Sequence, residues 1–163
     1  MKALAAALVL LAAEGSNDAG TAQQGSRVRI TVRAIAATGG AEQIDPKLAP
    51  IAQNLAEFAK DFRWRNFQLL TEESLDLAFQ SAAQVELPGS RSVQVTPRQM
   101  APDGRIKVHL ELLGEHPEHS RKLHTDYTIQ RGGTIFVGGL RLDPAKPGAG
   151  TLLVAVTQEM GGN

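Results

Sequence analysis

The sequence predicts an α+β domain, a mostly antiparallel β-sheet or sandwich of about eight strands with one amphipathic helix packed on it. Three observations predict this fold. Short segments in which apolar and polar residues alternate recur along most of the chain. Turns that contain glycine or proline separate these segments. A single segment, about residues 45–62, instead repeats apolar residues at steps of three and four, which is the spacing of a helix.

The first strand is expected at residues 26–36, where the alternation is most regular. Val28, Ile30, Val32 and Ala34 would lie on one face, and arginine and threonine side chains on the other. This pattern is typical of a strand with one face in the core.

The helix at residues 45–62 carries one apolar stripe. Asp45 is expected to cap its first turn, and Pro46 suits the first helical position because the N–H there needs no partner. Pro50 is expected to divide a loose first turn from the helix proper. One helix cannot bury its stripe alone, so we expect it to lie on the sheet. The stripe consists of Leu48, Ile51, Leu55, Phe58 and Phe62.

The rest of the chain is expected to form strands joined by short turns. These strands are predicted at residues 66–70, 74–79, 84–87, 92–96, 105–113, 123–130, 134–142 and 151–157. The turn Pro88-Gly89-Ser90 should close a hairpin between two of them. Residues 151–157 are apolar on both faces, which indicates a central, buried strand.

Two of these strands, at residues 105–113 and 123–130, suggest their own register. An antiparallel pairing with Leu112 opposite Leu123 brings apolar residues together on one face. The same register pairs complementary polar residues on the other face. These pairs are Glu111 with His124 and His109 with Asp126.

A second hairpin is expected at Gly132-Gly133, because two glycines supply the positive φ angles of a tight turn. It would fold residues 134–142 back onto the preceding strand, so that Tyr127 covers Gly138. Residues 105–142 would then form a three-stranded meander.

Charge and composition exclude several classes of function. Seventeen basic and seventeen acidic residues cancel, so no overall field attracts the chain to nucleic acid or anionic lipid. One tryptophan, one tyrosine and five phenylalanines are too few for a platform that stacks nucleotide bases. The absence of cysteine excludes disulfides and thiolate metal sites. We therefore expect no nucleic-acid partner.

The N-terminus predicts export. Met1-Lys2 precedes an apolar run from Ala3 to Ala13 and then small and polar residues, which is the pattern of a secretory signal peptide. A run of this length is too short to span a bilayer as a helix, which takes about 20 residues. We therefore expect a signal peptide at residues 1–15, a flexible leader at 16–25 and one β-rich domain at 26–160, with no membrane span in the mature, periplasmic chain.

The histidines offer one candidate metal site. His116 and His119 flank a proline in a polar loop, with Glu115 and Glu118 beside them. Such groups bind zinc or copper, but these fall in a turn and no third ligand is evident. No G-x-S-x-G motif or phosphate-binding loop occurs. We therefore expect no enzyme, no catalytic residue, no cofactor and no metal.

The run from His124 to Leu140, HTDYTIQRGGTIFVGGL, resembles the signature hairpin of bacterial secretins, which are outer-membrane channel proteins. A secretin is several times longer, so the resemblance implies a hairpin and an envelope setting rather than a channel. The chain also resembles a group of short exported proteins of Gram-negative bacteria, through IDPKL at 44–48, LPGSR at 87–91 and the glycine-paired hairpin. That group has no known activity from which functional residues could be transferred.

Together these features lead us to expect a non-enzymatic periplasmic or envelope protein. It would act through contact with a protein partner, as an accessory of a secretion or pilus apparatus. The alternative is a module that binds a small ligand or carbohydrate, in which Trp64, Arg63 and Arg65 line a site where the helix meets the sheet.

Overall fold

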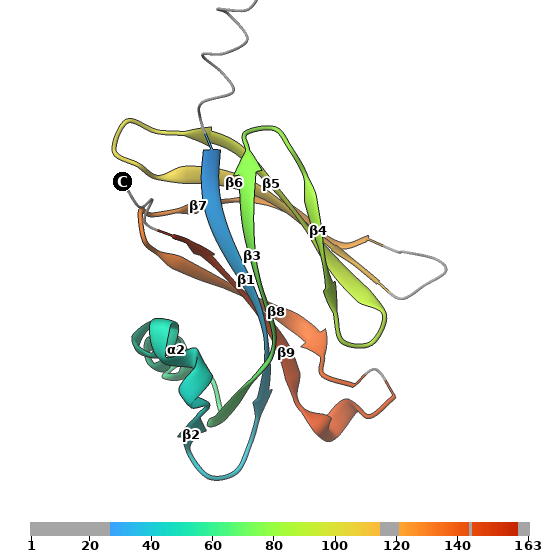
Figure 1. Ribbon diagram of the computed structural model, residues 1–163. Helices are drawn as coiled ribbons and strands as arrows, with labels where there is room; N and C mark the ends of the chain where they lie inside the picture. The colour runs from blue at the N-terminus through green and yellow to red at the C-terminus, as the bar shows by residue number, and fades with distance from the viewer. Residues whose placement is uncertain (1–26, 115–120, 144, 160–163) are drawn as a thin grey trace, which may run out of the picture.

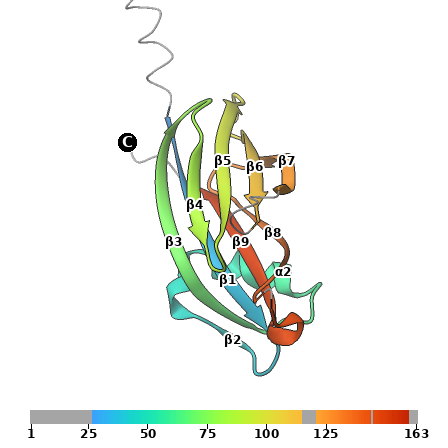
Figure 2. The same ribbon diagram turned by 90° about the vertical axis from the view of Figure 1, so that its right-hand side faces the viewer.

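The computed structural model describes residues 27–114, 121–143 and 145–159. Nine strands in these ranges form two sheets that pack face to face (Figures 1 and 2), which confirms the expected α+β fold. The five-stranded sheet has the order β2-β3-β1-β9-β8, and the four-stranded sheet the order β4-β5-β6-β7. The predicted signal peptide and leader lie outside the described residues, as does most of the loop at 114–120.

The strands have the following bounds. The five-stranded sheet contains β1 (Arg27–Thr38), β2 (Gln43–Ile44), β3 (Asn66–Ala78), β8 (Thr134–Arg141) and β9 (Thr151–Gln158). The four-stranded sheet contains β4 (Ala83–Leu87), β5 (Arg91–Met100), β6 (Ile106–Leu113) and β7 (Arg121–Ile129). A short 3-10 turn, η3 (Pro147–Ala149), precedes β9.

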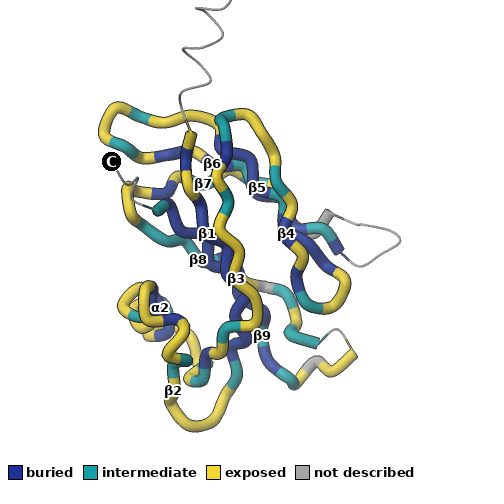
Figure 3. The backbone as a smooth tube through the Cα atoms, in the orientation of Figure 1, coloured by how far each residue is buried: buried dark blue, intermediate teal, exposed yellow. Residues whose placement is uncertain are grey.

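The main core lies between the two sheets (Figure 3). Strand β1 contributes the predicted residues to it, from Val28 to Ala34 at alternate positions. The facing side chains of the four-stranded sheet are equally buried, and Val95, Ile106 and Val108 are all fully enclosed. Strand β9 pairs with β1 on one side and β8 on the other and is buried on both faces, which confirms that it is central.

The helical segment is shorter than predicted and is divided at the predicted place. A 3-10 helix, η2 (Pro46–Ile51), contains Pro50, and the α-helix α2 (Ala52–Ala59) follows it. The segment covers the outer face of the five-stranded sheet, as expected. Phe62 was expected in the buried stripe but is 46% exposed, because the α-helix ends before it. No helix of the described chain is long and apolar enough to cross a membrane.

Asp45 fastens the start of this segment to β3. Its carboxylate accepts hydrogen bonds from the backbone N–H of Lys47 at 3.0 Å and of Leu69 at 3.1 Å. These two bonds lower the pKa of Asp45 because they favour its ionised form. The predicted cap is therefore confirmed, and it also joins helix to sheet.

Replacing Asp45 with alanine should lower the urea midpoint of unfolding at neutral pH. Since the folded state lowers the pKa of Asp45, its stabilisation is present above the ordinary aspartate value of about 3.9 and is lost as pH falls through the folded value. The difference between wild type and variant should therefore shrink in acid. The matched control is Glu42→Ala, which removes a nearby exposed carboxylate. A difference that stayed constant down to the acid limb would contradict this role.

One expected break in the sheet is absent. Residues 66–70 and 74–79 were predicted as two strands, but β3 runs without interruption between them. Leu70 is skipped in the pairing with β1 and forms a β-bulge. The polar residues after it continue the strand because β1 offers them partners, and Arg33 donates from Nε to Glu72 at 2.7 Å.

The expected meander is correct for two strands and wrong for the third. Strands β6 and β7 pair in the predicted register, with Leu112 opposite Leu123. Strand β8, however, pairs with β9 in the other sheet, so Gly132-Gly133 forms a corner between the sheets and Tyr127 does not face Gly138. The physical reason is that β9 is buried on both faces, so the backbone N–H and C=O groups along both of its edges need strand partners, and β8 supplies the second.

Candidate functional site

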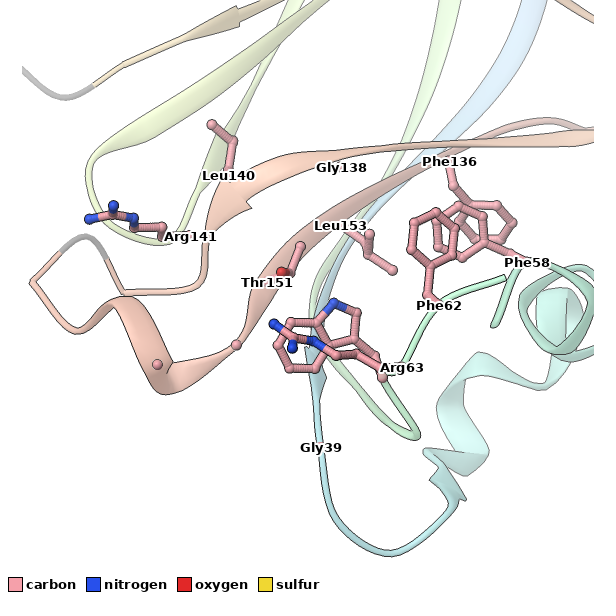
Figure 4. Close-up of a pocket in the computed structure, with 13 residues that line it drawn as sticks. Gly39, Phe58, Phe62, Arg63, Phe136, Gly138, Leu140, Arg141, Thr151 and Leu153 are labelled. Atoms are coloured by element: carbon pink, nitrogen blue, oxygen red, sulfur yellow. The ribbon is translucent and has the colours of Figure 1, made fainter. Parts of the chain in front are cut away.

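A cavity of about 830 Å³ lies where the end of the helical segment meets β8 and β9 (Figure 4). Three parts of the chain enclose it: the helix with the turn that follows, the two strands, and the loops that precede β2 and β9. The described lining residues are Gly39, Phe58, Phe62, Arg63, Trp64, Phe136, Gly138, Leu140, Arg141, Gly148, Gly150, Thr151 and Leu153.

An aromatic wall forms one side of this pocket. Phe58 of α2 stacks on Phe62, with ring centroids 4.5 Å apart, and also contacts Phe136 of β8 at 4.9 Å. Figure 4 shows the three rings gathered on the same side of the cavity. Phe62 is therefore a wall of the pocket rather than a core residue, which accounts for its exposure.

Two glycines of the pocket lining, Gly138 and Gly150, occupy positions where a side chain would be crowded. The register of β8 against β9 shifts between Val137 and Leu140, so the strand is irregular at its glycine pair. A Cβ at Gly138 would lie 3.1 Å from Cδ2 of Leu153, so any side chain there would crowd the pocket floor. A Cβ at Gly150, whose φ is +128°, would lie 2.6 Å from the carbonyl oxygen of Ala37, so only glycine fits.

The mouth of the pocket is positively charged. The guanidinium of Arg63 lies 5.3 Å from the ring centroid of Trp64, a cation–π contact that holds the charge beside the aromatic surface. Arg141 also lines the cavity, but its guanidinium points away from the aromatic wall (Figure 4). None of the described lining residues is acidic. An anionic group bound beside Arg63 would therefore contact no carboxylate among the described lining residues.

Two of the three residues proposed from the sequence reach this site. Arg63 and Trp64 line the pocket, whereas Arg65 is not among the described lining residues. Its backbone N–H instead donates to the Thr38 carbonyl oxygen at 3.0 Å. Phe136 also lines the pocket, and its place there could not be expected from the sequence because it depends on the position of β8. His116 and His119 lie outside the described residues.

The fold and the site together define the class of protein. It is a β-sandwich domain with a pocket beside a short helix, and this pocket is lined by aromatic residues and by arginine. Comparison with protein-family models, with curated proteins and with solved structures gave no match for this chain.

Proposed function

We propose that this protein is a non-enzymatic binding protein of the cell envelope, and that its aromatic pocket takes an amphiphilic ligand. The ligand would combine an apolar chain or ring with one anionic group. The observation that carries the proposal is a pocket with four aromatic side chains, an arginine at its mouth and no acidic residue among the described lining residues. The envelope setting rests on the signal-like N-terminus of the sequence.

The size and lining of the pocket favour a small apolar ligand over a sugar. Small-molecule sites typically measure about 300–1,000 Å³ and are mostly apolar, with few polar groups to fix orientation. The cavity of about 830 Å³ falls in that range. A sugar needs many hydrogen-bonding partners, and among the described lining side chains only two arginines, Thr151 and the indole N–H of Trp64 offer them.

The presence of Arg63 in the pocket lining is the reason to expect an anionic group on the ligand. A guanidinium forms paired, charge-assisted hydrogen bonds with carboxylate and similar anions. Stacking on Trp64 restricts Arg63 before the ligand arrives, which reduces the entropy lost on binding. Apolar contacts in the pocket would then supply affinity, and Arg63 would select the charge of the head group.

Tryptophan fluorescence tests this directly, because Trp64 is the only tryptophan in the chain. Titration with laurate, dodecanol and dodecyltrimethylammonium, each below its critical micelle concentration, compares three head groups on one alkyl chain. We expect laurate to bind most tightly. Arg63→Gln should weaken laurate by roughly tenfold, about 1.4 kcal/mol, and leave dodecanol nearly unchanged.

Two variants serve as controls for the pocket. Gly138→Val should weaken all three ligands, because its side chain would enter the space beside Leu153. Met100→Ala removes an exposed apolar side chain at the far end of β5 and should change nothing. Fluorescence that no ligand alters, or affinities that Gly138→Val leaves intact, would rule out this function.

A protein partner is the second candidate, and the position of β8 favours it. Within the described chain β8 is the last strand of its sheet and pairs on one side only, with β9. Its residues also line the pocket. An extended segment of a partner, such as a secretion or pilus component, could add to this edge and place an apolar side chain in the cavity. Laurate would then compete with the partner for the pocket.

A further inference from the structure

A second cluster of chemically active side chains lies on the other sheet. Strand β6 turns Val108 and Leu110 toward the core, so His109 and Glu111 face outward. This outer face carries the two polar cross-strand pairs that the register places together. They are His109 with Asp126 and Glu111 with His124.

Three of these side chains converge on one point. Oε1 of Glu111 lies 3.2 Å from Nε2 of His109 and 3.1 Å from Nδ1 of His124. One ligand atom from each of the three residues lies within 4.8 Å of the others. Tetrahedral ligands about 2.1 Å from a zinc ion are spaced about 3.4 Å apart, so small side-chain rotations would bring all three atoms onto one ion.

Asp126 determines which nitrogen of His109 is available. Nδ1 of His109 lies 2.7 Å from Oδ1 of Asp126, and this hydrogen bond lowers the pKa of Asp126. When Nδ1 of the neutral ring donates its proton to the carboxylate, Nε2 carries a lone pair. In this tautomer the lone pair faces Oε1 of Glu111, and either a second proton on the ring or a bound cation would satisfy both acceptors. Metal-bound histidines commonly show this carboxylate contact on the other nitrogen.

We propose that His109, Glu111 and His124 bind a divalent transition-metal ion such as Zn²⁺, and that Asp126 orients His109 for this role. Two imidazoles and a carboxylate suit zinc and its neighbours rather than magnesium or calcium. The side chains of His109 and Glu111 are 12% and 15% exposed, whereas that of His124 is 51% exposed. The site is therefore open on the side of His124, where water or a ligand group could complete the coordination.

The site is independent of the aromatic pocket, because no residue is shared between them. It also departs from the expectation that the chain holds no metal. The ligands His109 and Glu111 form a His-x-Glu pattern on β6, and the ligand His124 with the orienting Asp126 forms a His-x-Asp pattern on β7, with alternate residues on one face. Joined with the strand register, this spacing brings three ligands together, whereas the sequence around His116 and His119 offers no evident third ligand.

Isothermal titration of the tag-free, full-length chain, stripped of metal with EDTA, tests the proposal. We expect one Zn²⁺ per chain and no measurable binding of Mg²⁺ under the same conditions. His124→Ala and Glu111→Gln should each weaken Zn²⁺ binding by about 100-fold or more, and Asp126→Ala by about tenfold. Thr128→Ala, an exposed residue on the same strand, should match wild type.

Thermal unfolding separates loss of the site from loss of the fold. Excess Zn²⁺ should raise the melting temperature of wild type by roughly 5 °C and leave that of His124→Ala unchanged. His124 is half exposed, so its metal-free variant should keep the circular dichroism spectrum of wild type. The proposal is overturned if folded wild type does not bind Zn²⁺. It is also overturned if His124→Ala still binds while the double variant His116→Ala/His119→Ala does not.

Discussion

Replacing Phe67 with alanine is expected to lower the free energy of unfolding by about 4 kcal/mol. Phe67 is 2% exposed and belongs to the cluster that the helical segment forms with the five-stranded sheet. Its ring is enclosed by residues such as Ile35, Leu48 and Leu55, each fully buried. Removing it would leave a cavity that these neighbours cannot fill without shifting the helix. Urea unfolding followed by circular dichroism measures the change.

The same substitution at Phe62 is the matched control. Phe62 follows the same helix but is 46% exposed, so Phe62→Ala should cost no more than about 1 kcal/mol. It should instead weaken ligand binding, because it removes part of the aromatic wall. Equal losses of stability at the two positions would show that the helix does not bury Phe67 as described.

Replacing Arg91 with methionine is expected to cost about 3 kcal/mol of stability. Arg91 begins β5 in the four-stranded sheet and is only 5% exposed. Its guanidinium donates to the carbonyl oxygens of Arg141 at 2.6 Å and Leu142 at 3.1 Å, at the end of β8 in the other sheet. It also donates to the carbonyl oxygen of Pro88 at 2.9 Å. Without the arginine these carbonyl oxygens lose their partner, and the cost is partly offset where water can enter.

An exposed arginine provides the comparison. Arg27 forms an ion pair with Asp76, but both side chains are more than half exposed, so Arg27→Met should change stability by less than about 1 kcal/mol. Arg91→Lys keeps the charge and loses the planar fork, and should fall between wild type and Arg91→Met. Equal stability of wild type and Arg91→Met would mean that this link between the sheets contributes nothing.

Features that depend on neighbouring residues or on one pair of strands could be predicted from the sequence. The alternation in β1 identified its core face, and the proline pattern located the break between η2 and α2. The register of β6 and β7 followed because apolar and polar matches on the two faces agree on one alignment. Each of these depends on short-range geometry that does not change with the topology of the rest of the chain.

The partner of β8 could not be predicted in this way. A turn at Gly132-Gly133 has the same chemistry whether it closes a hairpin or carries the chain from one sheet to the other. The choice is made by β9, which lies later in the chain and needs a second neighbour. Local turn signals cannot include that requirement, because it arises from packing between distant segments.

The aromatic pocket shows the same limit. Arg63 and Trp64 could be proposed because they follow directly on the predicted helix. Phe136 became part of the site only because β8 joins the sheet that the helix covers. The proposed metal ligands differ in this respect, since the register that brings them together could be predicted from the sequence.

The pairing of the first and last strands has a practical consequence for experiments. Strand β1 begins, and β9 ends, at the same end of the sandwich, where Ile30 pairs with Gln158. The pocket is lined from the opposite part of the sandwich, by Gly39 just after β1, by the start of β9 and by the end of the helical segment. Figure 1 shows these elements at the other end from the start of β1. A twelve-residue strand such as β1 spans roughly 40 Å. A linker that leaves the sandwich at either of these strand ends would immobilise the protein on a sensor surface with its binding mouth directed into solution.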